Sequence, residues 1–316
     1  MLLNISFVIV GLVLLTSGAE GLVRGSASLA IRVGIAPLVI GLTIVAFGTS
    51  APELVVSLIA SLKNQGDVAL GNVIGSNIFN VGIILGLTAL ICPVIVSLQV
   101  IKHDGPIMIA VSIIAMIIIA KGFISRLMGT MLLMALGAYT FYTILMSKRG
   151  APSVIEKQFA DGIPSRTSSV YRDLTFIGGG LLFLVVGSRL LVESATEIAR
   201  LVGISEAVIG LTVIAGGTSL PELATSIVAA IRRQPDIAVG NVVGSNIFNI
   251  LGILGVASIV KPLKASGITD FDLWVMVAFT IALLPLLYTK LILQRWEGVI
   301  LFFGYIVYLW ILWPSG

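Results

Sequence analysis

The chain has 316 residues, of which 58% are hydrophobic and only 11% are charged, and its mean hydropathy is +1.13. A soluble domain has about a quarter of its residues charged, so this composition excludes an ordinary soluble protein and indicates an integral membrane protein. The net charge of +4 does not indicate a nucleic-acid partner, because the basic residues lie mostly at the ends of apolar segments, where they set membrane topology.

Apolar segments separated by polar, glycine or proline residues predict an all-α fold of ten membrane-spanning helices. In chain order these helices cover residues 2–31, 37–63, 68–91, 104–121, 125–147, 174–202, 206–232, 237–260, 270–290 and 297–313. No Lys or Arg precedes Arg24, so the first segment lacks the basic start of a secretory signal. It is predicted to remain as an uncleaved span.

The sequence contains an internal repeat. Residues 39–80 overlay residues 208–249 without a gap, and 26 of these 42 positions are identical. The matches include asparagine, glutamine and threonine, which a shared apolar composition does not explain. We therefore predict a duplicated five-helix unit, with a first repeat at residues 1–147, a linker at 148–173 and a second repeat at 174–316. Because five is odd, the second repeat starts from the opposite side of the membrane, and the repeats are inverted, as in many secondary transporters.

The distribution of Lys and Arg predicts the orientation of the chain. If the N-terminus lies on one side, the loops and linker on the opposite side contain eleven basic residues against six. By the positive-inside rule the linker is then cytoplasmic, and both termini are extracellular or periplasmic. We expect a multi-pass protein of the plasma (inner) membrane.

Each repeat has a carboxylate beside a proline in the middle of an apolar segment. The motif is Gly-Thr-Ser-Ala-Pro-Glu at residues 48–53 and Gly-Thr-Ser-Leu-Pro-Glu at residues 217–222. Proline is favoured where a helix begins, so each motif predicts a helix break near the midplane. Ser-x-x-Glu is also a capping-box pattern, in which Glu53 and Glu222 would only cap the new helices. An ionisable residue at membrane depth is unfavourable and by default marks a functional site.

A second repeated motif adds amides and hydroxyls to the next helix. Within it, Ser76 and Asn80 are four residues apart and share one face of a helix, as do their counterparts Ser245 and Asn249. A polar stripe of this kind can instead hold helices together, and that alternative stays open for the other asparagines of the motif. The motif is Gly-Asn-Val-x-Gly-Ser-Asn-Ile-Phe-Asn, at residues 71–80 and 240–249.

Together the repeats offer the oxygen ligands that hard cations such as calcium prefer: carboxylates, amides, hydroxyls and carbonyls freed by the breaks. The candidate side chains are Glu53, Glu222, Asn80, Asn249, Thr49, Thr218, Ser50, Ser219, Ser76 and Ser245. One histidine and one cysteine argue against zinc or copper. Two carboxylates balance one divalent ion, and sodium ions or protons must replace it when it leaves. Besides these ions and the lipid bilayer, no cofactor, nucleic acid or obligatory protein partner is expected.

At these residues the sequence resembles the cation/calcium exchanger superfamily and is most similar to its prokaryotic sodium/calcium exchanger branch. The resemblance implies an antiporter that exchanges calcium for sodium, with Glu53 and Glu222 as ligands shared by both ions. It also implies that the helices at residues 4–32 and 175–202 slide to alternate access. The further ligands that it implies are Thr49, Thr218, Asn80 and Asn249 at the central sites, and Ser50, Ser219, Ser76, Ser245 and the carbonyls of Ala46 and Ala215 at flanking sodium sites.

The sequence disfavours two alternatives to sodium/calcium exchange. Proton/calcium exchangers commonly have an acidic residue where this chain has Gly75 or Gly244, and its absence disfavours that alternative. Some relatives have Asp in place of Asn80 or Asn249, so the two asparagines also disfavour proton binding and potassium dependence there. An intramembrane hydrolase with a glutamate dyad is disfavoured because two catalytic carboxylates need different environments, whereas the duplication makes them similar.

Overall fold

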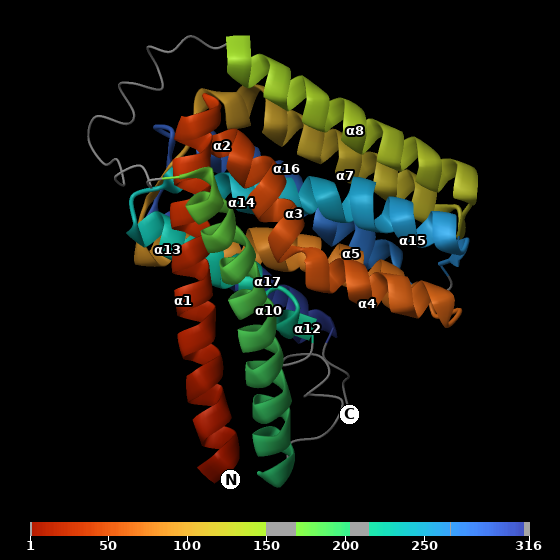
Figure 1. Cartoon of the computed structure of the whole chain (residues 1–316). Helices are drawn as coiled ribbons and strands as arrows, with labels where there is room; N and C mark the ends of the chain where they lie inside the picture. The colour runs from red at the N-terminus through yellow and green to blue at the C-terminus, as the bar shows by residue number, and fades with distance from the viewer. Residues whose placement is uncertain (1, 150–168, 203–214, 266, 313–316) are drawn as a thin grey trace.

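The structure is a computed structural model that describes residues 2–149, 169–202, 215–265 and 267–312 (Figure 1). Its N-terminal part contains α1 (Leu2–Val33), α2 (Pro37–Ile40), the π-helical turn η1 (Gly41–Val45), α3 (Ala46–Thr49), α4 (Ala51–Leu62), α5 (Gly66–Phe79), η2 (Asn80–Leu85), α6 (Gly86–Ile91), β1 (Val94–Ile95), η3 (Val100–Asp104), α7 (Gly105–Ala120), β2 (Phe123–Ile124) and α8 (Arg126–Arg149). The C-terminal part contains α10 (Val170–Leu201), α12 (Ala215–Gly217), α13 (Leu220–Ile231), α14 (Pro235–Phe248), η5 (Asn249–Leu254), α15 (Gly255–Val260), β3 (Leu263–Lys264), α16 (Asp270–Tyr288), β4 (Ile292–Leu293) and α17 (Arg295–Leu312).

The predicted spans agree with these helices wherever the structure describes them. Eight helices are long and apolar enough to cross a membrane, or nine if one bent pair counts as a single span, within the described residues. Of the seventh predicted span, residues 206–214 lie outside that part of the chain, as do residues 150–168 of the predicted linker. The all-α prediction is confirmed, with the addition of four two-residue strands that pair β1 with β4 and β2 with β3.

The first broken helix is the bent pair, and its break lies where the Pro-Glu motif predicts it. Only Ser50 separates α3 from α4, and the helix bends by 47° there. Pro52 lies in the first turn of α4, where a missing N–H is tolerated. It also removes the donor that the carbonyl of Gly48 would have in a continuous helix. The second motif follows the same pattern, since α12 ends at Gly217 and α13 begins at Leu220.

The helices that carry the second motif form the centre of the protein. In the apolar windows of Gly66–Ile91 and Pro235–Val260, 72% and 89% of residues are buried, against 22% to 39% in the other long spans described. Both change to a π-helical turn at the last asparagine of the motif, because η2 begins at Asn80 and η5 at Asn249. Such turns insert an extra residue and occur frequently at functional sites.

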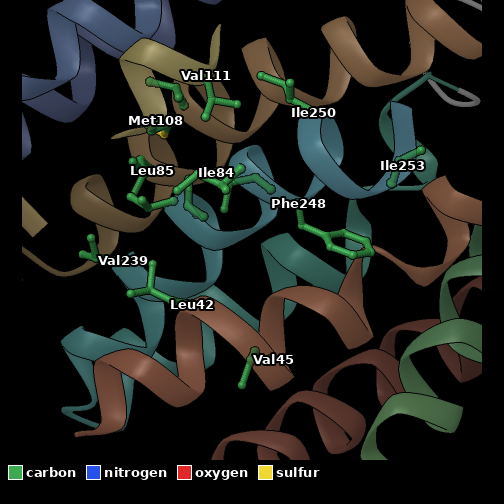
Figure 2. Close-up of a cluster of buried hydrophobic side chains, with 14 of the residues drawn as sticks. Leu42, Val45, Ile84, Leu85, Met108, Val111, Val239, Phe248, Ile250 and Ile253 are labelled. Atoms are coloured by element: carbon green, nitrogen blue, oxygen red, sulfur yellow. The ribbon is translucent and has the colours of Figure 1, made fainter. Parts of the chain in front are cut away.

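Apolar side chains from several segments pack around this centre (Figure 2). Leu42 and Val45 extend from η1, Ile84 from η2, and Ile250 from η5, and all four are at most 4% exposed. Because close packing in membranes relies on such complementary contacts, this cluster holds the broken helix against both motif helices.

A tyrosine–aspartate hydrogen bond recurs in the two halves of the chain. Tyr139 Oη donates to Asp104 Oδ1 at 3.0 Å, and Tyr308 Oη donates to Asp272 Oδ1 at 2.9 Å. Tyr139 and Tyr308 are separated by the same number of residues as equivalent positions of the internal repeat, although they lie well outside its region of high identity. The duplication therefore extends to the fifth helix of each half.

The long helices α1 and α10 lie side by side and run across the other helices (Figure 1). Glycines allow their backbones to touch: a Cβ atom on Gly18 would lie only 2.7 Å from the carbonyl oxygen of Gly180. Small residues at such contacts are typical of tightly packed membrane helices. At one end of the pair, Arg32 Nε donates to Asp173 Oδ2 at 2.8 Å. The Asp173 side chain is 0% exposed and that of Arg32 18%, so this ion pair is largely shielded from solvent.

We expect Asp173→Ala to lower the free energy of unfolding by about 3 kcal/mol, because it removes the buried carboxylate that balances the charge of the Arg32 guanidinium. The measurement is the melting curve of the purified protein in detergent. Glu193→Ala is the matched control on the same helix, because the Glu193–Arg189 pair is 68% and 81% exposed and should contribute less than about 1 kcal/mol. Equal shifts for the two variants would contradict a structural role for the Arg32–Asp173 pair.

Candidate ion-binding site

The two helix breaks meet inside the protein, and each glutamate is held by a serine of the other half. Ser50 Oγ donates to Glu222 Oε1 at 2.8 Å, and Ser219 Oγ donates to Glu53 Oε1 at 2.9 Å. All four side chains are at most 1% exposed. Neither serine caps its own helix with its side chain, so the capping-box alternative is wrong. The glutamates instead face the junction of the two halves.

Further hydroxyl groups extend this junction on both sides. Ser245 Oγ lies 3.0 Å from Ser50 Oγ, and Ser76 Oγ lies 3.5 Å from Ser219 Oγ. Both partners come from the motif helices α14 and α5, one turn before Asn249 and Asn80. The structure therefore brings the predicted serines into one chain of polar groups that includes both glutamates.

The two predicted threonine ligands differ in their surroundings. Thr49 Oγ1 lies 3.0 Å from the carbonyl oxygen of Val45 and 3.0 Å from Asn241 Oδ1, so its proton has an acceptor inside the protein. Thr218 Oγ1 is buried and has no hydrogen-bond partner among the residues that the structure describes. Asn241 of the second half thus holds the hydroxyl group of Thr49 in the first half.

Of the two predicted carbonyl ligands, Ala46 and Ala215, the first already accepts hydrogen bonds within the protein. The carbonyl oxygen of Ala46 accepts the backbone N–H of Ser50 at 3.0 Å, and the Thr49 hydroxyl lies 3.4 Å from it, so protein donors already reach this oxygen. Ala215 is the first described residue of α12, and residues 203–214 before it lie outside the described part of the chain. The carbonyl oxygens that lose a helical donor to proline are those of Gly48 and, in the second half, Gly217.

Besides the Thr218 hydroxyl, four buried carboxylate and amide oxygens at the junction have no hydrogen-bond partner within the described part of the chain. They are one carboxylate oxygen of each glutamate and one amide oxygen of each motif asparagine: Glu53 Oε2, Glu222 Oε2, Asn80 Oδ1 and Asn249 Oδ1. Buried polar atoms are normally paired, so each exception requires an explanation. Here the exceptions match in pairs across the two halves and are all hard oxygen acceptors. Carboxylate and amide oxygens are ligands that calcium and sodium accept, so cation binding would explain why these acceptors are left unpaired.

Hydrogen bonds from two motif asparagines hold the broken helices in place, and sequence reasoning missed the serines that accept them, Ser57 and Ser226. Asn72 Nδ2 donates to the carbonyl oxygen of Glu53 at 3.0 Å and to Ser57 Oγ at 2.8 Å. The second half repeats the bonds at 3.2 and 3.0 Å, with Asn241, Glu222 and Ser226. Asn72 and Asn241 therefore hold helices together, the alternative left open above. Ser57 and Ser226 were detectable, because they are identical in the two repeats.

Comparison with known proteins identifies the family. The profile of the family described as sodium/calcium exchanger protein matches residues 3–145 and 173–313, which is most of the chain. This chain belongs to the sodium/calcium exchanger family. The exchanger is 38% identical to the inner membrane protein YrbG of Escherichia coli, over 90% of its own length and 89% of that protein. It is 32% identical to the sodium/calcium exchanger MaX1 of Methanosarcina acetivorans, over 98% of both chains.

The fold agrees with a solved exchanger. The sodium-calcium exchanger NCX_Mj, in a structure soaked without sodium and calcium, superimposes with a TM-score of 0.84 at 33% sequence identity and 98% coverage of this chain and 99% of that one. Family and fold together place the exchanger among multi-pass membrane antiporters that transport ions rather than among enzymes. The hydrolase alternative is therefore wrong.

The two halves of the exchanger differ beside the site, where Phe47 of the first repeat corresponds to Gly216 of the second. The Phe47 ring lies edge-on to Phe248, with ring centres 5.1 Å apart. A Cβ atom on Gly216 would lie 3.4 Å from the ring of Phe79, which is the counterpart of Phe248. The ring of Phe248 thus packs against Phe47 in one half, whereas in the other half the ring of Phe79 lies against Gly216 and pairs instead with Tyr305.

Proposed function

We propose that this exchanger moves calcium against sodium by alternating access, with the ions bound between the two repeats near the membrane midplane. The observation that supports this proposal best is the set of four buried, unpartnered oxygens of Glu53, Glu222, Asn80 and Asn249. Two carboxylates match the charge of one calcium ion, and the amide oxygens add neutral ligands of the kind that calcium binds.

The remaining polar groups of the junction are proposed to complete the sites. Thr49 and Thr218 belong to the central sites with the four oxygens above. The flanking sodium sites are proposed to use Ser50, Ser219, Ser76, Ser245 and the carbonyls of Ala46 and Ala215. Sodium accepts the same hard oxygen ligands, so one set of glutamates can serve both ions in turn. Without a cation the two buried carboxylates repel each other, which disfavours the change between the two access states when the site is empty. The flux of calcium is thereby coupled to the flux of sodium.

The moving part is proposed to be the pair α1 and α10. Their glycine contacts and the Arg32–Asp173 ion pair join them to each other, so they can shift together across the central helices. We further propose the plasma (inner) membrane as the location, since YrbG is named an inner membrane protein. In this proposal both termini are outside, and residues 148–173 form a cytoplasmic linker between repeats at 1–147 and 174–316.

The test is transport in sealed vesicles that contain the purified protein. Vesicles loaded with sodium and diluted into sodium-free buffer should take up radioactive calcium, because outward sodium flow drives exchange. Vesicles with equal sodium on both sides are the control and should show only slow, nonspecific uptake. Uptake that follows an imposed pH gradient and ignores sodium would overturn the proposal in favour of a proton/calcium exchanger.

A further inference from the structure

Two asparagines outside the proposed ligand set lie at the centre of the molecule. Asn77 on α5 is 2% exposed and Asn246 on α14 is 1% exposed. Each donates its side-chain amide to the main chain of the other: Asn77 Nδ2 to the carbonyl oxygen of Asn246, and Asn246 Nδ2 to that of Asn77, both at 3.3 Å. This reciprocal pair joins the two most buried helices of the exchanger.

The same two asparagines also contact the proposed ligand amides. Asn80 Nδ2 donates to Asn246 Oδ1 at 2.9 Å, and Asn249 Nδ2 donates to Asn77 Oδ1 at 3.0 Å. Each bond crosses from one half to the other. It occupies the nitrogen of the ligand amide and leaves the oxygen, Asn80 Oδ1 or Asn249 Oδ1, as the unpartnered atom.

The geometry permits only one orientation of each amide. If the Asn77 amide turned over, its oxygen would face the carbonyl oxygen of Asn246, and its nitrogen would face Asn249 Nδ2. Both contacts would oppose like groups in a buried setting, where an unmet hydrogen bond is strongly unfavourable. An ionised aspartate in place of Asn249 would likewise present an oxygen to Asn77 Oδ1, with no hydrogen to donate.

Building on the proposed function, we propose that Asn77 and Asn246 are positioning residues. They turn the amide oxygens of Asn249 and Asn80 toward the bound cation. They also select amides over carboxylates at these two positions. Asn77 acts through Asn249, and Asn246 acts through Asn80. The cation site then keeps the charge of two glutamates only, which suits one divalent ion.

A crossed set of double mutants tests this assignment. Calcium affinity is measured by equilibrium binding to the purified full chain in detergent, for Asn77→Ser and Asn246→Ser in wild-type, Asn249→Ala and Asn80→Ala backgrounds. We expect Asn77→Ser to weaken binding about tenfold in the wild-type and Asn80→Ala proteins, but less than about twofold in Asn249→Ala. Asn246→Ser should show the mirror pattern, with its effect lost only in Asn80→Ala.

The two serine variants are matched controls for each other, because they lose equivalent bonds between α5 and α14. If Asn77 only stabilises the fold, its effect on affinity will be the same in both alanine backgrounds, and the assignment is overturned. Asn77→Thr and Asn246→Thr, which retain more side-chain volume, replace the serine variants if those do not give monodisperse protein. Failure of the wild-type protein to bind calcium would refute the proposed function instead, so the two failures are distinguishable.

Discussion

Glu53→Gln is expected to reduce sodium-driven calcium uptake at least about 100-fold, and Glu222→Gln should do the same. Glutamine keeps the shape of glutamate and can still accept the serine hydrogen bond, so the fold should remain intact. It removes one of only two negative charges at the junction, and calcium affinity depends strongly on the charge of its ligands. The measurement is radioactive calcium uptake into vesicles under an outward sodium gradient, normalised to the amount of folded protein.

The control for this experiment is Glu297→Gln. Glu297 is also 0% exposed, but it accepts the backbone N–H of Gln294 at 2.7 Å at the start of α17, away from the helix breaks. Its replacement should leave uptake within about twofold of the wild type. If Glu53→Gln and Glu222→Gln both retained transport, the junction would not be the ion site, whatever its geometry.

Gly180→Ala is expected to lower the free energy of unfolding by about 1–3 kcal/mol and to impair transport, because it separates α1 from α10. A Cβ atom there would lie 2.6 Å from the backbone nitrogen of Leu22 and 2.7 Å from the carbonyl oxygen of Gly18. Both neighbours are main-chain atoms, so no side chain can move aside to make room. The melting temperature in detergent and calcium uptake in vesicles are the measurements.

Gly179→Ala is the matched control for this change. Gly179 is exposed, and a Cβ atom on it would meet nothing within 4 Å. The substitution should stabilise the helix slightly, by up to about 1 kcal/mol, because alanine is the better helix former. Equal destabilisation by both substitutions would show that the close contact of α1 and α10 is unimportant.

Much of the architecture was predictable from the sequence. The repeat between residues 39–80 and 208–249 implied duplication, and proline after the Gly-Thr-Ser motif predicted the helix breaks to within two residues. These features are local: proline removes a specific backbone donor, and an apolar segment of fixed length spans a bilayer whatever its neighbours are. Whether the Ser-x-x-Glu motif caps its own helix or faces the other half could not be read from the local sequence. Ser50 has the same sequence neighbours in either case.

The sequence by itself determined the duplication, the helix breaks and the identity of the oxygen-bearing side chains, because these depend on composition and spacing along one chain. Only the tertiary structure decided which half supplies the partner of each group. Ser50 bonds to Glu222 rather than to its own neighbour Glu53, and Asn77 accepts a hydrogen bond from Asn249 rather than from Asn80. Both repeats present nearly the same residues, so local sequence cannot distinguish bonds within a half from bonds between halves. Packing of the inverted halves makes that choice, and among the described residues it leaves two carboxylate and two amide oxygens unpaired at their junction.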